Sequence, residues 1–163
     1  MDGALIIRKV TEKDSKVLFS WRNDESVRKY SRSNRLITFD EHTEWFKKYL
    51  NSMSDSHLIL IFEKNGFIVG MTRFDRISES ASELSIILDP QFRGLGIGKL
   101  ILQTTLEFAT KNKMYDQLIA TLHTENIASI RAFKSLGFIQ IDQNGMFVTY
   151  SWFLKKDNNT SAI

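Results

Sequence analysis

Three closely spaced glycines, Gly94, Gly96 and Gly98, lie between a predicted strand and a predicted helix. Glycine lets the main chain approach a ligand closely, and the first turn of a helix leaves several N–H groups without an intrahelical partner. Those N–H groups and the positive end of the helix dipole favour a phosphate or pyrophosphate. Arg93 and Lys99 flank the glycines and add positive charge. We therefore predict an anion-binding turn, and the competing interpretation is a tight turn without a ligand.

The spacing of these glycines excludes two common phosphate-binding loops. A Walker A loop needs Ser or Thr after its lysine, and here Leu100 follows Lys99. A dinucleotide-binding fingerprint needs Gly-x-Gly-x-x-Gly near the first strand of the chain, whereas this chain has Gly-x-Gly-x-Gly in its middle. The predicted anion site is therefore neither of these nucleotide-binding loops.

Length and composition exclude several classes of protein. A chain of 163 residues with 42% apolar and 25% charged side chains is typical of one globular domain. A net charge of +3 without a basic run does not favour nucleic acid binding. The lack of cysteine excludes a disulfide framework and a cysteine nucleophile, and the three histidines have no metal-ligand spacing. We expect neither a signal peptide nor a membrane-spanning run, and hence a cytoplasmic protein.

The pattern of apolar residues and turn signals predicts alternating strands and helices around the glycines. A three-stranded meander precedes them, and a strand–helix–strand unit after Leu88 implies a locally parallel pair with a crevice where the two strands diverge. We predict a single-domain α/β fold, a mixed, mostly antiparallel sheet with helices on both faces, over residues 1–156, followed by a polar tail at 157–163. The expected strands are 4–10, 57–63, 67–75, 81–88, 117–122, 138–142 and 146–155, and the expected helices are 14–23, 39–50, 96–111 and 126–136. The segment 24–37 is expected to form a polar loop, and a short helical turn within it is the alternative.

Two motifs in this order are shared with a known family. One is Gln/Arg-x-x-Gly-x-Gly/Ala between a strand and a helix, and it occurs in two overlapping registers that begin at Gln91 and Arg93. The other runs from Asn126 to Gly137-Phe138 and includes the small residue Ser129 and the aromatic Phe133. With both motifs in the expected order, the chain resembles the GNAT superfamily of acyl-CoA-dependent N-acyltransferases along nearly its whole length.

The resemblance implies that acetyl-CoA is the cofactor and that the glycine turn holds its pyrophosphate. It also implies that main-chain groups of residues 86–88 pair with the pantetheine arm and that Asn126 contacts the same arm. No metal is expected. The residues expected to bind the cofactor are Ile86, Ile87, Leu88, Arg93, Gly94, Leu95, Gly96, Ile97, Gly98, Lys99, Asn126, Ser129 and Phe133.

Acetyl transfer to an amine needs a base for the ammonium group and is assisted by an acid for the leaving thiolate. Glu83, on the strand that leads to the glycine turn, is the candidate base, and strand alternation allows a relay through Ser85 and water. His123, at the expected crevice, is the alternative base. The family usually has a tyrosine acid where this chain has Phe133, and Tyr150 is a speculative substitute. The competing interpretations are a solvated carboxylate, an ordinary loop histidine and a core tyrosine.

Basic side chains in the first two helices and their loop indicate the acceptor site. Arg22, Arg28, Arg32, Arg35 and Lys29 form a cluster in sequence that suits a diphosphate, unless they are simply a solvated basic loop. Because the chain lacks cysteine, direct transfer in a ternary complex is favoured over a covalent acyl-enzyme.

Several segments (21–23, 38–46, 73–75 and 83–86) also resemble aminosugar-nucleotide N-acetyltransferases of the pseudaminic-acid pathway. This resemblance implies an acceptor with a 4-amino group on a UDP-linked deoxysugar. Two alternatives stay open: acetylation of a protein N-terminus, as in ribosomal-protein acetyltransferases, or of another small amine, and a non-catalytic acyl-CoA-binding protein. The edge of the final hairpin could pair in a homodimer, although nothing in the sequence requires it. The residues expected to bind the acceptor are Arg22, Asn23, Arg28, His42, Trp45 and Arg73.

Overall fold

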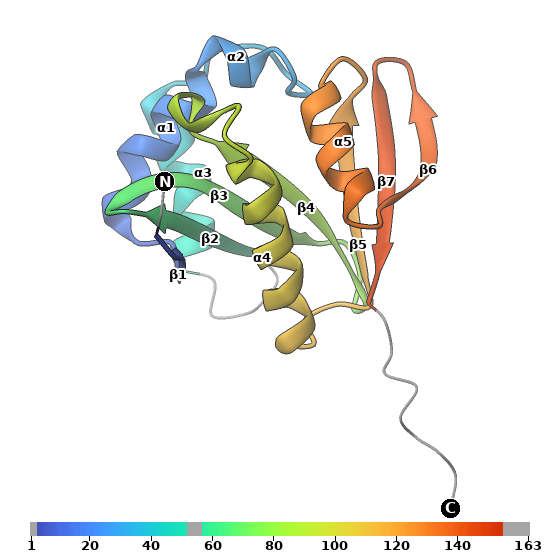
Figure 1. Ribbon diagram of the computed structural model, residues 1–163. Helices are drawn as coiled ribbons and strands as arrows, with labels where there is room; N and C mark the ends of the chain where they lie inside the picture. The colour runs from blue at the N-terminus through green and yellow to red at the C-terminus, as the bar shows by residue number, and fades with distance from the viewer. Residues whose placement is uncertain (1–2, 52–56, 155–163) are drawn as a thin grey trace, which may run out of the picture.

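A seven-stranded sheet with helices on both faces forms the centre of the computed structural model, which describes residues 3–51 and 57–154 (Figure 1). The strand order is β1-β2-β3-β4-β5-β7-β6, and every neighbouring pair is antiparallel except β4 and β5. The predicted mixed, mostly antiparallel α/β fold is therefore confirmed. The strands are β1 (Leu5–Lys9), β2 (His57–Lys64), β3 (Phe67–Arg76), β4 (Ala81–Leu88), β5 (Gln117–His123), β6 (Ile139–Asn144) and β7 (Phe147–Phe153).

The helices follow the predicted order, with one addition. Thr38 and Glu41 form a capping box at the start of the second long helix. Within the segment predicted as a loop, Asp24 caps a short helix by accepting a hydrogen bond from the Ser26 N–H at 2.9 Å. The tail predicted at 157–163 lies outside the described residues. The helices are α1 (Ser15–Asn23), α2 (Glu25–Arg28), α3 (Phe39–Leu50), α4 (Ile97–Lys111) and α5 (Ile127–Ser135), with 3-10 turns at Glu12–Asp14 and Pro90–Phe92.

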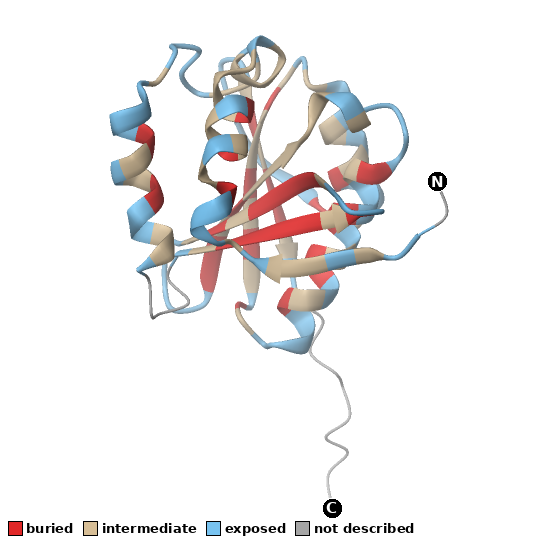
Figure 2. Ribbon diagram, turned by 90° about the vertical axis from the view of Figure 1, so that its left-hand side faces the viewer, coloured by how far each residue is buried: buried red, intermediate tan, exposed pale blue. Residues whose placement is uncertain are grey.

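Two hydrophobic cores hold the helices against opposite faces of the sheet. Successive residues of β2 alternate between them, because side chains along a strand point to opposite faces: Leu60 and Phe62 face one core, Ile59 and Ile61 the other. The first core receives apolar side chains of α4 and α5, and the second receives those of α1 and α3. Figure 2 shows the corresponding band of buried residues along the middle strands. The sheet is thereby fixed from both sides.

The parallel pair at the centre of the sheet is short, and this positions the site. β4 pairs with β5 only from Ala81 to Glu83, opposite Gln117 to Ile119. Beyond Glu83 the two strands diverge, as Figure 1 shows. On its other side β4 stays paired with β3 as far as Leu88. The crevice expected between these strands is therefore present, and one edge of β4 faces it without a strand partner.

Gly70 of β3 keeps β4 in place by allowing a close approach. A Cβ atom at Gly70 would lie 2.8 Å from the carbonyl oxygen of Ile87 and 2.7 Å from Cδ1 of Ile101. Both distances are shorter than a normal contact, so a side chain here would displace the main chain of β4 or the side chain of α4.

We predict that Gly70→Ala lowers the free energy of unfolding by about 1–3 kcal/mol, because overpacking forces neighbouring atoms to move. Thermal unfolding measures the change, at about 2–4 °C for each kcal/mol in a chain of this size. Gly98→Ala is the matched control: its Cβ meets only Leu88 Cδ2, at 3.6 Å, and alanine suits a helix. Equal melting temperatures for the two variants would contradict the prediction.

Candidate functional site

A cavity of about 1090 Å³ opens where β4 and β5 diverge. Residues 83–88 of β4 line one wall, residues 121–123 of β5 and the start of α5 line another, and the glycine turn and the α2 segment complete it. It brings together most of the residues expected from the sequence: Arg22, Arg73, Glu83, Ser85, Ile86, Ile87, Leu88, Arg93, Gly94, Gly96, Gly98, Lys99, His123, Asn126, Ser129 and Phe133. Leu95, Ile97, Tyr150, Asn23, Arg28, His42 and Trp45 do not line it.

Two of the three glycines have the conformation that only glycine adopts readily. Gly94 has a φ of 76° and Gly96, the residue before α4, a φ of 75°. Gly98 has no positive φ and lies in the first turn of α4. Its missing side chain therefore leaves room rather than permitting a turn. The glycine turn thus presents the N-terminus of a 15-residue helix to the cavity.

The side chains next to these glycines differ in whether they are buried, exposed or part of the cavity wall. Ile97 is buried in the first core, and Leu95 is exposed and lies outside the cavity, so only their main-chain groups belong to the glycine turn. Arg93 lines the cavity and donates a hydrogen bond to the Ser26 hydroxyl at 2.6 Å. This contact joins the glycine turn to α2, which forms the opposite rim.

The second motif of the sequence has a structural role at the start of α5. The side-chain oxygen of Asn126 accepts a hydrogen bond from the Ser129 N–H at 3.3 Å and caps the helix. That bond leaves the amide NH₂ of Asn126 available to the cavity. Phe133 is buried and packs edge-on against Phe138 at 4.8 Å, so its ring closes the cavity from the core side.

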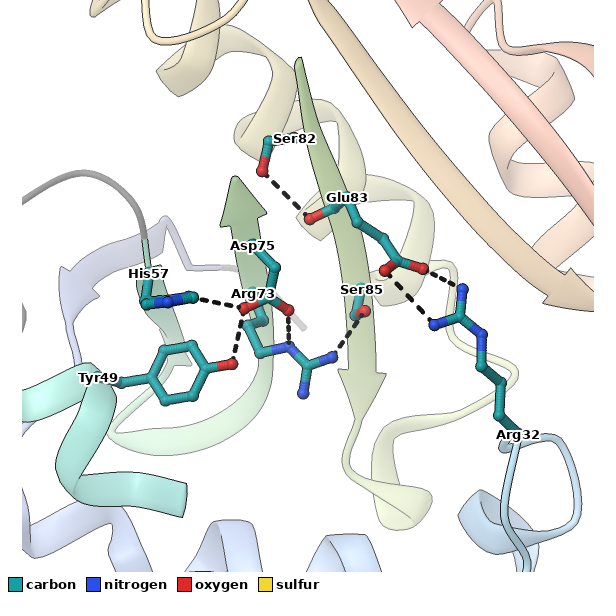
Figure 3. A network of polar contacts seen from close by, with 8 residues as sticks. All are labelled: Arg32, Tyr49, His57, Arg73, Asp75, Ser82, Glu83 and Ser85. Carbon is teal, nitrogen blue, oxygen red and sulfur yellow. Dashed lines mark hydrogen bonds and ion pairs between the residues drawn. The ribbon is translucent and has the colours of Figure 1, made fainter. Parts of the chain in front are cut away.

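The carboxylate of Glu83 is paired in this structure. Arg32 reaches it from the segment after α2, with nitrogen–oxygen distances of 2.5 and 3.5 Å (Figure 3). Ser85, two residues along β4, accepts a hydrogen bond from Arg73 at 3.4 Å instead of contacting Glu83 directly. Glu83 and Ser85 share no direct hydrogen bond, and the relay through Ser85 and water stays a prediction.

Arg73 is held in the cavity wall by a network behind it. Asp75 forms an ion pair with Arg73 at 2.7 Å, and it accepts hydrogen bonds from Tyr49 at 2.7 Å and from His57 at 3.2 Å (Figure 3). Burial raises the pKa of Tyr49, so its hydroxyl stays protonated and donates to Asp75. The ring of Trp45 lies 5.7 Å from the Arg73 guanidinium. Trp45 therefore supports Arg73 and does not line the cavity.

Arg22 carries a positive charge that no described acidic side chain neutralises. It is half-buried on the cavity wall and donates a hydrogen bond to the Ser31 hydroxyl at 3.0 Å. Burial lowers the pKa of Arg22, and the neighbouring Arg73 and Arg35 lower it further. A partly desolvated guanidinium next to a second one favours an anionic ligand.

The Nε2 atom of His123 carries a hydrogen, so it can donate a hydrogen bond but cannot accept one. Its Nδ1 atom accepts a hydrogen bond from the Glu125 N–H at 3.2 Å, so the proton of the neutral ring is on Nε2. The buried ring lies between Tyr30 and Phe147, at 5.7 and 5.4 Å. This arrangement is unfavourable for a general base at His123.

Four residues expected in the site have structural roles elsewhere. His42 is buried among aromatic rings, where burial lowers its pKa, and its Nε2 lies 3.1 Å from the Ser15 hydroxyl. Asn23 exchanges two hydrogen bonds with the main chain of residue 37, both at 2.9 Å, and Arg28 donates to main-chain oxygens of residues 23 and 34. Tyr150 is buried in the first core. The structure therefore places these four expected acceptor and acid residues outside the cavity, because tertiary packing uses their side chains.

Tyr30 is a cavity residue that the sequence did not indicate. It lines the cavity beside His123, and its hydroxyl has no hydrogen-bond partner among residues 3–51 and 57–154. Its position follows from the path of the 24–37 segment, which Asn23 and Arg28 hold across the cavity rim. No residue pattern in the segment indicates this path.

Two further findings concern metals and membranes. Within residues 3–51 and 57–154, no group of histidine and acidic side chains could hold a metal ion. The same part of the chain contains no helix that is both long and apolar enough to cross a membrane.

Comparison with known proteins gives related sequences and folds. An uncharacterised protein of Methanocaldococcus jannaschii is 29% identical over 140 residues, which are 84% of this chain but only 28% of that protein. The spermidine N-acetyltransferase of Vibrio cholerae, crystallised with CoA and spermine, has a similar fold, with a TM-score of 0.81 over 92% of this chain and 95% of its own, at 16% identity. The ribosomal-protein-alanine N-acetyltransferase of Brucella melitensis matches with a TM-score of 0.74 over 91% and 99%, at 23% identity.

The family model that matches the chain covers most of it. Residues 4–139 match the model described as an acetyltransferase (GNAT) domain. This range includes the strand β4, the glycine turn and the Asn126 motif that together surround the cavity. The chain belongs to the GNAT acetyltransferase family.

Proposed function

We propose that this protein is an acetyl-CoA-dependent N-acetyltransferase that transfers acetyl directly to a primary amine. The observation that carries the proposal is the unpaired edge of β4, which faces a cavity that also receives the N-terminus of α4. The described cavity wall has six basic and two acidic side chains, which fits a ligand with several phosphates: Arg22, Arg32, Arg73, Arg93, Lys99 and Arg131 against Glu83 and Glu125.

The residues that would hold acetyl-CoA follow from this geometry. Main-chain N–H groups between Gly94 and Lys99 would bind the pyrophosphate, with charge from Arg93 and Lys99. On the edge of β4 that points away from β3, main-chain groups of Ile86 to Leu88 have no partner strand and would pair with the amides of the pantetheine arm. The free amide NH₂ of Asn126 could donate to the same arm.

In the proposed reaction Glu83 accepts the proton of the acceptor's ammonium group. When the deprotonated amine attacks the thioester carbonyl, the carbon–nitrogen bond forms and the carbon–sulfur bond breaks. The nitrogen then loses a second proton, which balances the proton that the leaving thiolate takes up. Glu83 suits the first step because it lies on the cavity wall at the point where β4 and β5 part. Because Nδ1 of His123 accepts from the Glu125 N–H, Nε2 carries a hydrogen and suits hydrogen bonding to a carbonyl or phosphate better than proton removal.

The acceptor that we propose is the 4-amino group of a UDP-linked aminodeoxysugar. Arg22, Arg32 and Arg73 on the acceptor side of the cavity support an acceptor with a diphosphate. The same charges disfavour spermidine, the substrate named for the Vibrio cholerae enzyme, because a polyamine is itself positively charged. A protein N-terminus is the alternative acceptor.

A thiol-release assay with acetyl-CoA and a panel of amines tests this proposal. We expect a UDP-linked 4-aminodeoxysugar to exceed spermidine and an alanine-starting peptide by tenfold or more in kcat/KM. Arg22→Gln should raise the KM of the acceptor about tenfold, since a hydrogen bond to a charged group contributes about 1.5–3 kcal/mol, and leave the KM of acetyl-CoA unchanged.

Two negative results would distinguish a protein that lacks the activity from one that does not bind acetyl-CoA. If no amine is acetylated although acetyl-CoA raises the melting temperature, the chain is an acyl-CoA-binding protein without this activity. If acetyl-CoA at saturating concentration does not raise the melting temperature, the cofactor proposal is wrong, because a ligand that binds only the native state must stabilise it.

We further propose that Tyr30 protonates the leaving thiolate. Phe133 lacks the hydroxyl that the family usually has at its position, and Tyr150 is in the core. Among the described residues that line the cavity, Tyr30 is the only tyrosine, and its hydroxyl is free to contact a ligand.

Tyr30→Phe should lower kcat by about tenfold or more, since a positioned acid contributes up to 10²–10⁴ and a thiolate is a good leaving group. Tyr150→Phe removes the same hydroxyl from a buried position outside the cavity and should leave kcat near that of the parent. Steady-state kinetics at saturating acetyl-CoA separates the two. An unchanged kcat for Tyr30→Phe would mean that the thiolate leaves without this acid.

A further inference from the structure

The ion pair between Arg32 and Glu83 covers the carboxylate that would act as base. One terminal nitrogen of Arg32 lies 2.5 Å from Oε1 of Glu83, and the other lies 3.5 Å from Oε2 (Figure 3). Both residues line the cavity. A carboxylate whose two oxygens face a guanidinium cannot accept the proton of an ammonium group from that direction. In the structure as it stands, the base is therefore masked.

Arg32 differs from the other arginines of the acceptor side because its movement would lose little interaction free energy. Its side chain is 64% exposed, and its described polar contacts are only those with Glu83. Exposed ion pairs contribute little to stability. Arg73, in contrast, is held by Asp75 and Trp45, and Arg22 is half-buried and bound to Ser31.

We infer that Arg32 makes the release of Glu83 depend on an anionic group of the acceptor. This inference rests on the proposed function. The fixed guanidiniums of Arg22 and Arg73 attract the diphosphate, and Arg32 exchanges the carboxylate of Glu83 for a phosphate oxygen. The exchange is favourable because a charge-assisted bond to phosphate is stronger than an exposed ion pair.

This exchange gives Arg32 a role in specificity. An amine without an anionic group leaves Arg32 on Glu83, so the base stays masked and transfer is slow. Neutral and cationic amines are thus disfavoured in two ways. They leave Glu83 paired with Arg32, and they lack the contacts that the correct acceptor makes. Arg32 is therefore a positioning residue that acts through Glu83.

The test separates the diphosphate from the amine. The assay uses saturating acetyl-CoA and a 4-aminodeoxysugar without a nucleotide, with and without UDP added as a separate molecule. In the parent protein, UDP should stimulate transfer to the bare aminosugar. In Arg32→Gln, transfer to the bare aminosugar without UDP should rise by up to about fivefold, which corresponds to the loss of one exposed ion pair, and UDP should no longer stimulate it.

Two further variants control this experiment. Arg76→Gln removes an exposed arginine of β3, which lies over the Tyr115 ring at 5.8 Å and does not line the cavity, and it should behave like the parent. In a Glu83→Gln background, Arg32→Gln should have no effect on the bare aminosugar, because no base is left to release.

Three results would overturn the inference: UDP stimulating the parent and Arg32→Gln equally, UDP failing to stimulate the parent, or Arg32→Gln slowing the bare and the UDP-linked aminosugars to the same extent. Each of these leaves the proposed acetyltransferase intact, because the amines are still acetylated. Absence of transfer to every acceptor, in the parent and in both arginine variants, contradicts the proposed function itself.

Discussion

The structure depends on a main-chain constraint at the centre of the sheet: beyond Glu83, β4 has a partner on only one side. N–H and C=O groups in a protein interior need hydrogen-bond partners, and an unpaired strand edge therefore has to be covered by water or by a ligand. The two cores fix β3, β4 and the flanking helices, so the strands cannot close the opening. The divergence of two strands thus becomes a binding cavity, and the glycine turn places the N-terminus of α4 beside it.

The charges around this cavity divide into fixed and movable ones. Arg73 is anchored by Asp75, and Arg22 is half-buried, so both hold positive charge at set positions whether or not a ligand is bound. Arg32 lies on an exposed segment and neutralises Glu83. Under the proposed function, this division would let a wall rich in arginine hold the carboxylate base, which we propose stays neutralised until another anion replaces it. Specificity for the acceptor and activation of the base then share one side chain.

Much of the fold and of the cofactor side could be predicted because those features are local. The capping box at Thr38, the glycine turn and the strand alternation each follow from a few neighbouring residues, and the structure has them. The acceptor side depends on packing between distant segments, which the sequence does not show. His42 and Tyr150 have side chains that suit chemistry, but tertiary contacts bury them, and Tyr30 enters the cavity only because the 24–37 segment crosses its rim. The sequence predicts a crevice between β4 and β5, but it does not show how short the pairing of these two strands is.

A crystal structure of the protein with coenzyme A would show whether the open edge of β4 and the glycine turn bind the cofactor. We predict that the pyrophosphate lies within about 2.7–3.2 Å of main-chain nitrogens between Gly94 and Lys99. The pantetheine amides should pair with Ile86 to Leu88 along the open edge of β4, as an added strand would. A coenzyme bound elsewhere, or one that leaves this edge of β4 unpaired, would contradict the account.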